Sequence, residues 1–201
     1  MTSVIVGFLL TGVVGTALTQ YFFDRRQDEQ LRAQRAQDRQ DALDIAIQLT
    51  GESQIRIELL GEALLSNQSP EKIDKLKDEQ EAAAIEWRRE VPRLLLLARE
   101  LLGQAEYDRF RANIETRLKE EKLDPLRECL DEAYAQVGDI DGVKQIIEQC
   151  RFDQRMEEVA VCAEAILGGL YEMTAADGVV TGEIDEARRR ELGDEVTQAC
   201  S

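Results

Sequence analysis

The feature that most constrains this chain is an uncharged apolar run from Val4 to Phe23. A helix rises about 1.5 Å per residue, so a run of about twenty residues spans about 30 Å, the thickness of the hydrocarbon core of a bilayer. In lipid, the backbone N–H and C=O groups must form their hydrogen bonds within the segment, which favours a helix. The run therefore predicts a single transmembrane helix, an anchor formed by residues 1–23.

Two other interpretations of this run fit less well. A buried helix of a soluble domain is rarely uncharged over such a length. A cleaved signal peptide begins with basic residues, whereas Met1, Thr2 and Ser3 carry none, and no clear small-residue cleavage pattern ends the run. We therefore expect an anchor that is retained.

Small residues recur along one side of the predicted anchor, a pattern that lets two membrane helices approach closely. They are Gly7, Thr11, Gly15 and Thr19, with Gly12 and Thr16 beside them. The pattern predicts self-association or docking on another membrane helix, although the same residues also suit a face turned to lipid. Residues expected at the membrane interface follow, namely Tyr21, Phe22, Phe23, Arg25 and Arg26.

The distribution of arginine predicts the orientation of the anchor. No Lys or Arg precedes the apolar run, whereas five Arg lie within residues 24–40. The positive-inside rule then predicts a single-pass inner-membrane protein with its N-terminus outside and the bulk of the chain in the cytoplasm.

Residues 24–42 predict a charged helical stalk, because they contain neither Pro nor Gly and little apolar content. Arg25, Arg32 and Arg39 recur at heptad spacing and could lie on anionic lipid headgroups. A solvated helix with ion pairs between residues four apart is the interpretation that we favour.

The rest of the chain predicts an all-α protein, an antiparallel helical bundle. Aromatic residues make up only 5% of the chain and prolines number three, while Ala, Glu, Leu, Gln and Arg dominate long stretches. We divide it into an amphipathic helical hairpin at residues 43–102 and an acidic helical bundle region at 103–201. The broad apolar face that begins at Leu43 is expected to pack in the bundle.

Several local signals predict how the bundle helices begin, end and pack. Ser69 and Pro70 predict a helix start, and the helix that follows carries a coiled-coil-like apolar seam. Gly51 predicts an interruption of its helix, and Pro92 predicts a kink or division. The run Leu94–Leu97 is expected to be buried on all sides. Asp124 is expected to cap a helix start, and Gly168 and Gly169 are expected to allow close helix approach.

The formal net charge of −16 restricts the partners. Residues 24–40 hold five Arg against four acidic residues, so the acidic excess lies in the rest of the chain. Such a domain repels nucleic acid and anionic lipid and favours a basic protein partner, although a charged, soluble helical surface explains the same composition.

Catalytic chemistry is not indicated anywhere in the chain. The absence of histidine excludes Ser-His-Asp and Cys-His sites, H-E-x-x-H zinc sites and E-x-x-H di-iron sites. No phosphate-binding glycine-rich loop occurs. We therefore expect no enzyme, no catalytic residues, no cofactor and no metal.

The four cysteines are Cys129, Cys150, Cys162 and Cys200, and no two of them form a C-x-x-C pair. In the cytoplasm that the orientation predicts, they would be free thiols packed as small apolar groups. In an extracytoplasmic domain, the even count would permit two disulfides.

One short motif, Ala176-Asp177-Gly178 followed by Glu183, resembles the A-D-G turn of the TerB-like helical domains associated with tellurite resistance. The resemblance covers one helix–turn–helix and implies a metal site on acidic turn residues. The same residues also form an ordinary turn, which is the simpler interpretation. The alternating acidic ligands of an EF-hand are missing.

These observations predict that the protein is a membrane-anchored adaptor, scaffold or accessory subunit of a membrane complex. It would act through protein–protein contacts without catalysis. Two alternatives remain. One is an extracytoplasmic, disulfide-containing protein that spans the envelope, spanin-like in architecture. The other is a membrane-tethered metal or ligand sensor that uses carboxylates near Asp177.

Overall fold

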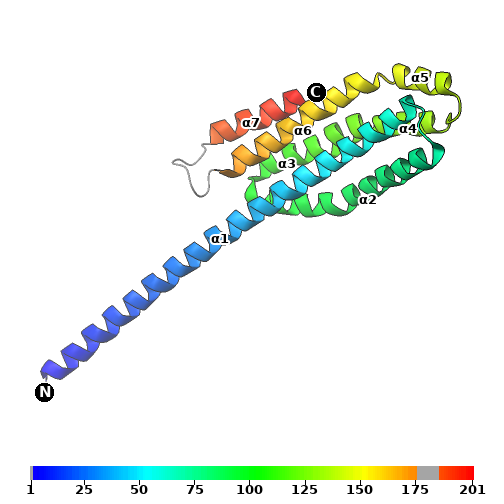
Figure 1. Cartoon of the computed structure of the whole chain (residues 1–201). Helices are drawn as coiled ribbons and strands as arrows, with labels where there is room; N and C mark the ends of the chain where they lie inside the picture. Colours follow the sequence, from blue (N-terminus) through cyan, green and yellow to red (C-terminus); the bar gives the residue numbers. More distant parts are fainter. Residues whose placement is uncertain (1, 176–185) are drawn as a thin grey trace.

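A computed structural model describes the backbone of residues 2–175 and 186–201, and the side chains of residues 25–174 and 186–201. The described residues form helices joined by short turns and contain no strand, which confirms the all-α fold (Figure 1). The elements are α1 (Thr2–Leu65), α2 (Pro70–Leu101), α3 (Gln104–Ala112), the π-helix η1 (Asn113–Leu123), α4 (Asp124–Tyr134), α5 (Ile140–Gln149), α6 (Phe152–Ala175) and α7 (Glu186–Ala199).

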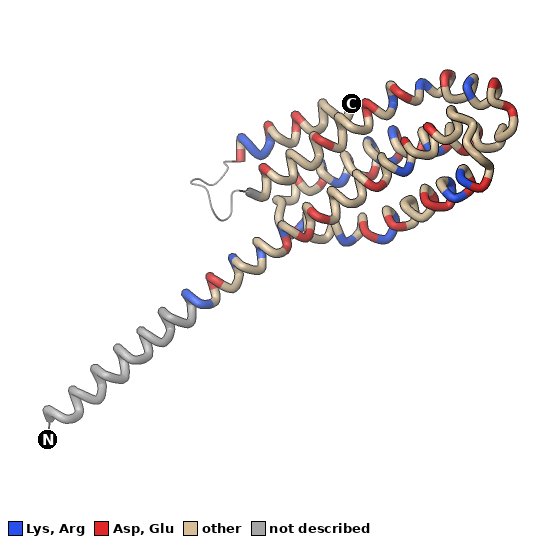
Figure 2. Tube along the Cα trace, viewed as in Figure 1, with Lys and Arg blue, Asp and Glu red and all other residues tan. Residues whose placement is uncertain are grey.

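The helix α1 is a long rod whose C-terminal half belongs to the bundle, while its first half projects away from it (Figure 1). Acidic and basic residues are interspersed along the stalk and over the bundle helices (Figure 2). The predicted interruption at Gly51 is wrong, because α1 runs through it without a break. Buried residues on both sides, such as Leu49 and Ile57, hold the helix on the bundle and outweigh the low helix propensity of one glycine.

A transmembrane span is not found in the part of the chain whose side chains are described: no helix there is both long and apolar enough to cross a membrane. The run Val4–Phe23, on which we predicted the anchor, lies outside that part.

The helix α2 lies against α1 and presents its apolar seam to the core, as its spacing predicted. Ile73, Trp87 and Leu94 are almost fully buried on this face. Pro70 occupies the first turn as expected, but Ser69 makes no capping hydrogen bond through its side chain. Pro92 does not divide the helix, because α2 continues through it to Leu101.

The expectation that Leu94–Leu97 is buried on all sides is wrong. Leu94 and Leu95 are buried, whereas Leu96 is 59% exposed and Leu97 is only partly buried. Consecutive residues on a helix point about 100° apart, and α2 has neighbours on one side only. A helix at the edge of a bundle therefore cannot bury four consecutive leucines.

The segment from α3 through η1 to α4 is one continuous helical stretch with a wider turn in its middle. Ile114, Leu118 and Leu123 are all buried, and the step of five from Leu118 to Leu123 suits the i→i+5 bonding of a π-helix. Asp124 has helical dihedral angles (φ −64°, ψ −43°), so the predicted helix start capped by Asp124 is wrong. Pro125 lies just after η1, and because it stands inside a continuous helix, its missing N–H leaves one backbone hydrogen bond unmade there.

The neighbouring glycines of α6 differ in their surroundings. A Cβ atom built on Gly169 would lie 2.5 Å from Cγ2 of Val196 on α7, whereas one built on Gly168 meets nothing within 4 Å. Close helix approach is thus confirmed at Gly169 and wrong at Gly168. Gly61 of α1 is packed in the same way as Gly169, with the Phe152 ring 2.6 Å from its Cβ position.

Alanine at these two adjacent positions is expected to change stability in opposite directions. Gly168→Ala should raise the free energy of unfolding by about 0.5–1 kcal/mol, because alanine favours the helix and has room. Gly169→Ala should lower it by about 1–3 kcal/mol, because the β-branched Val196 cannot move away without displacing α7. Urea titration followed by circular dichroism measures both. A stabilising Gly169→Ala would contradict the α6–α7 packing.

Candidate interaction surface

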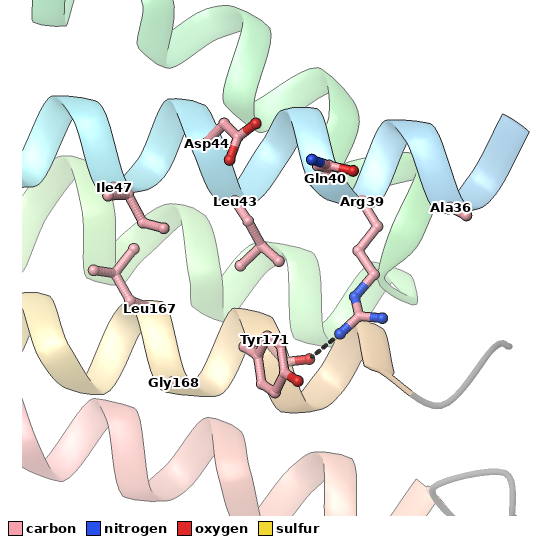
Figure 3. Close-up of a pocket in the computed structure, with 9 residues that line it drawn as sticks. All are labelled: Ala36, Arg39, Gln40, Leu43, Asp44, Ile47, Leu167, Gly168 and Tyr171. Carbon is pink, nitrogen blue, oxygen red and sulfur yellow. Dashed lines mark hydrogen bonds between the residues drawn. The ribbon is translucent and has the colours of Figure 1, made fainter. Parts of the chain in front are cut away.

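A groove between α1 and α6 forms an open cavity on the surface of the bundle (Figure 3). Its volume is about 630 Å³. The lining residues come from two helices: Ala36, Arg39, Gln40, Leu43, Asp44 and Ile47 of α1, and Leu167, Gly168 and Tyr171 of α6. The two helices run antiparallel, because Arg39 meets Thr174 at one end and Gly61 meets Phe152 at the other.

The floor of the groove is apolar and open to solvent. Leu43, Ile47 and Leu167 point into the space between the two helices (Figure 3). The side chains of Ile47 and Tyr171 are 54% and 57% exposed, although both are large and apolar over most of their surface. Exposed apolar side chains that gather in one hollow indicate an interaction site more strongly than scattered ones do.

Arg39 closes the end of the groove that lies nearest the stalk. Its Nε donates to Oγ1 of Thr174 at 3.1 Å, and Nη2 donates to the carbonyl oxygen of Tyr171 at 3.4 Å. Its guanidinium carbon lies 5.0 Å from the centroid of the Tyr171 ring, which is cation–π geometry. Arg39 therefore fastens the C-terminal end of α6 to α1.

Sequence reasoning did not find this groove. It predicted that the apolar face beginning at Leu43 packs in the bundle, but Ile47, Ile55 and Leu59 are exposed. A signal was present in their positions, since Ile47, Ile55 and Leu59 lie off the set of positions that carries the core face of α1, such as Ala46, Leu49 and Ile57. Tyr171 and Leu167 could not be assigned to the groove before the position of α6 was known.

The predicted membrane-facing residues fall mostly outside the described side chains. This holds for the small-residue stripe (Gly7, Thr11, Gly12, Gly15, Thr16, Thr19) and for Tyr21, Phe22 and Phe23. Arg25 and Arg26 are exposed, and Arg25 pairs with Glu29 at 3.3 Å, one turn further along α1. That pair is of the kind expected for a solvated stalk.

Two disulfide bonds join the C-terminal helices, so the expectation of free thiols is wrong. Cys129 of α4 is bonded to Cys150 at the end of α5, with their Cα atoms 6.1 Å apart. Cys162 of α6 is bonded to Cys200, which follows α7, with a Cα separation of 4.4 Å. The even count of cysteines permitted this arrangement, but spacing along the chain did not indicate it.

A buried polar cluster connects α4 to α1. The Arg127 side chain is 12% exposed; its Nη1 donates to Asp124 at 3.1 Å and its Nη2 to Ser53 of α1 at 3.5 Å. Burial lowers the pKa of Arg127, and the nearby Asp124 carboxylate opposes that effect. A second hydrogen bond to Asp124 comes from Lys119 at 2.6 Å. The two terminal nitrogens of Arg127 are paired, whereas its buried Nε has no hydrogen-bond partner among the described residues; we assign the cluster to packing between helices.

The acidic turn that resembles the TerB-like domains, with Asp177 and Glu183, lies outside the described residues. Within residues 25–174 and 186–201, no group of three or more His, Cys, Asp or Glu side chains is placed to hold a metal ion. Comparison with known protein families, curated proteins and solved structures finds no match to this chain.

Proposed function

We propose that this chain is a membrane-anchored, non-enzymatic helical adaptor whose bundle lies in an oxidising extracytoplasmic compartment and acts through protein–protein contacts. The apolar run at Val4–Phe23 supports the anchor, and the long α1 links it directly to the bundle. The lack of histidine and the open apolar groove between α1 and α6 support binding rather than catalysis.

The observation that best supports an extracytoplasmic bundle is that all four cysteines are paired in disulfides. Disulfides persist in secreted, periplasmic and other extracytoplasmic proteins, whereas cytoplasmic thiols are kept reduced. An extended charged stalk followed by a disulfide-bonded bundle also suits a protein that reaches from one envelope layer towards another.

A second candidate is an adaptor of the same kind with the bundle in the cytoplasm. The five arginines of residues 24–40 favour it through the positive-inside rule. Arg39 has a different explanation, because it binds Tyr171 and Thr174 within the bundle. The remaining four are the evidence for this orientation.

Sequential thiol trapping on cells that express the full chain tests the compartment. Free thiols are first blocked with N-ethylmaleimide during lysis in denaturant, and the sample is then reduced and treated with a polyethylene-glycol maleimide. We expect no blocked thiols before reduction and four added polymer chains afterwards. Four thiols blocked in the first step would favour the cytoplasmic candidate.

A single added cysteine gives an independent reading of topology. Leu96→Cys places a thiol on α2 at a residue that is 59% exposed, while the native cysteines stay paired. We expect a membrane-impermeant maleimide to label this variant in intact cells. Labelling only after the inner membrane is permeabilised would contradict the extracytoplasmic bundle, and the parent chain without the added thiol is the control.

A further inference from the structure

We propose that the Cys129–Cys150 bond is a site of thiol–disulfide exchange, which an external dithiol reduces while the Cys162–Cys200 bond stays intact. This reactivity goes beyond the proposed function, because it concerns neither the partner nor the compartment of the bundle. Its consequence is the release of α5 from α4.

The two disulfides differ in their access to solvent. Cys162 and Cys200 are both 0% exposed, so a reagent reaches their sulfur atoms only after the bundle opens. Cys129 is 3% exposed, and its partner Cys150 is only partly buried. A thiolate has to approach the sulfur atom that it attacks, so access decides which bond exchanges in the folded chain.

An open hollow lies at the Cys129–Cys150 bond, and both cysteines line it. Its volume is about 380 Å³, which is within the range of pockets that hold small molecules. The other lining residues come from α4, α5 and the first turn of α6, namely Pro125, Glu128, Glu132, Ile146, Gln149 and Arg155. The folded chain therefore offers a thiol a route to this bond.

The bond also lies at the end of the bundle that is remote from the stalk. The helix α5 occupies that end, whereas the first half of α1 projects from the opposite one (Figure 1). An anchor in the first half of α1 would therefore leave the hollow open to a reactant that comes from the aqueous phase.

The exchange consists of two balanced steps. A thiolate of the dithiol attacks Sγ of Cys150, the less buried of the two cysteines, and forms a mixed disulfide while Cys129 leaves as a thiolate. The second thiol of the reactant then attacks the reactant's own sulfur in the mixed disulfide and releases Cys150. Two electrons and two protons pass to the protein, so the products are the disulfide of the reactant and two protein thiols.

Three charged side chains line the hollow. Arg155 favours the approach of a thiolate, because a nearby cation stabilises the thiolate form. Glu128 and Glu132 are exposed and carry two negative charges, which oppose that approach. The rate of exchange should therefore depend on these charges as well as on access.

The helix α5 is short and has a small buried face. It buries Val143 and Ile147, with Ile146 partly buried. Its capping hydrogen bond, donated by the backbone N–H of Gly142 to Asp139 at 3.2 Å, lies within its own first turn and does not hold it on another helix. Reduction should therefore loosen α5, while α6 and α7 stay joined by the second bond.

Timed reduction of the purified full chain, kept oxidised in nanodiscs of zwitterionic lipid, tests the proposal. The probe is dithiothreitol, and each sample is quenched with acid, alkylated and mapped by mass spectrometry. We expect Cys129 and Cys150 to become free at least about tenfold faster than Cys162 and Cys200. Equal rates, or faster reduction of the Cys162–Cys200 bond, would overturn the proposal.

Low concentrations of urea distinguish attack on the folded chain from attack after opening. Attack through the hollow needs no opening, so the Cys129–Cys150 rate should stay within about twofold below the unfolding transition. The rate at the fully buried Cys162–Cys200 bond should rise steeply with urea. Parallel increases at the two bonds would rule out the hollow as the route.

Two further reagents identify the attacked sulfur and the kind of reactant. Brief treatment with glutathione, a monothiol, should leave a mixed disulfide on Cys150, and finding it on Cys129 would contradict the assigned direction of attack. Reduced thioredoxin is the probe for a protein dithiol. Reduction by it as fast as by dithiothreitol would make a protein the reactant, and reduction by dithiothreitol alone would make it a small dithiol. Failure of both dithiols would overturn the exchange site.

Charge variants test the hollow separately. Glu128→Gln with Glu132→Gln should speed reduction by dithiothreitol about two- to fivefold, and added salt should shrink the difference. The matched control is Glu52→Gln with Glu100→Gln, which removes two charges at exposed residues of α1 and α2 outside the hollow. That control should leave the rate unchanged, and the same rate in both variants would contradict attack within the hollow.

Hydrogen–deuterium exchange measures the release of α5. After selective reduction, the amides of residues 140–149 should lose protection at least about tenfold, while those of α7 keep theirs. Cys129→Ser with Cys150→Ser should show the same pattern without reductant, and unchanged protection of α5 would contradict its release. Thiol trapping in cells and labelling at Leu96→Cys report the compartment and not these rates, so a failure here is distinguishable from a failure of the proposed function.

Discussion

Removal of the Cys162–Cys200 bond is expected to lower the thermal midpoint of the bundle by roughly 10 °C. The bond closes a segment of 38 residues, and constraining a loop of that length in the unfolded chain contributes about 4 kcal/mol. For a protein of this size, each kcal/mol corresponds to about 2–4 °C. The variant is Cys162→Ser with Cys200→Ser, measured by circular dichroism of the full chain.

The effect is large because α7 buries little apolar surface, although Arg109 and Arg117 also bind it through the carbonyl oxygens of Arg190 and Thr197. The large side chains that α7 buries are few, chiefly Leu192 and Val196, and Val196 packs against Gly169 of α6. The bond attaches the end of α7 to a fully buried position of α6, since Cys162 and Cys200 are both 0% exposed. Without it, α7 should separate from the bundle before the remaining helices unfold.

The second disulfide is the internal comparison for this experiment. Cys129→Ser with Cys150→Ser opens a shorter loop, with a sequence separation of 21, and should cost about 3 kcal/mol. Adding reductant to the Cys162→Ser, Cys200→Ser variant should then produce a further drop of similar size. A thermal midpoint unchanged by Cys162→Ser with Cys200→Ser would show that this bond does not constrain the bundle.

Replacement of Trp87 by alanine is expected to lower the free energy of unfolding by about 3–5 kcal/mol. Trp87 is 1% exposed and belongs to the continuous core that α1 and α2 share with the C-terminal helices. Deleting the indole leaves a cavity that the surrounding helices can only partly close. Urea unfolding monitored at 222 nm measures the loss.

A neighbouring residue supplies the control for this variant. Ile85 lies on the same helix and is 63% exposed, so Ile85→Ala should change the free energy of unfolding by no more than about 0.5 kcal/mol.

Trp87→Phe adds a sharper comparison. The indole N–H of Trp87 has no hydrogen-bond partner among the described residues, so phenylalanine keeps most of the volume and removes a buried donor.

Trp87→Phe should therefore cost much less than Trp87→Ala. Equal losses for the two variants would mean that the indole N–H contributes a hydrogen bond that its surroundings do not indicate. Losses below about 1 kcal/mol for Trp87→Ala would contradict its place in the core.

Much of the helical architecture could be predicted because helix formation is read from neighbouring residues. The seam of α2 through Ile73, Trp87 and Leu94 follows steps of three and four, and Pro70 marks the beginning of that helix. The interruption predicted at Gly51 and the division predicted at Pro92 fail for one cause. Both residues weaken a helix locally, but burial of their neighbours keeps α1 and α2 unbroken.

The candidate site was beyond prediction because its parts lie far apart in the chain. Arg39 and Tyr171 are separated by 132 residues, and nothing near either one indicates the other. The apolar character of Leu43, Ile47 and Ile55 was visible. Whether those residues meet another helix depends on how many helices surround α1, which periodicity does not specify.

The sequence by itself determined that the described residues are helical, that an uncharged run of membrane-spanning length lies near the N-terminus, and that histidine chemistry is excluded. The tertiary structure alone decided that Cys129 pairs with Cys150 and Cys162 with Cys200, among the three pairings that four cysteines allow. It also decided which apolar residues of α1 stay exposed, such as Ile47 and Ile55. Helix periodicity is set by residues three and four apart, whereas these contacts depend on how whole helices stack.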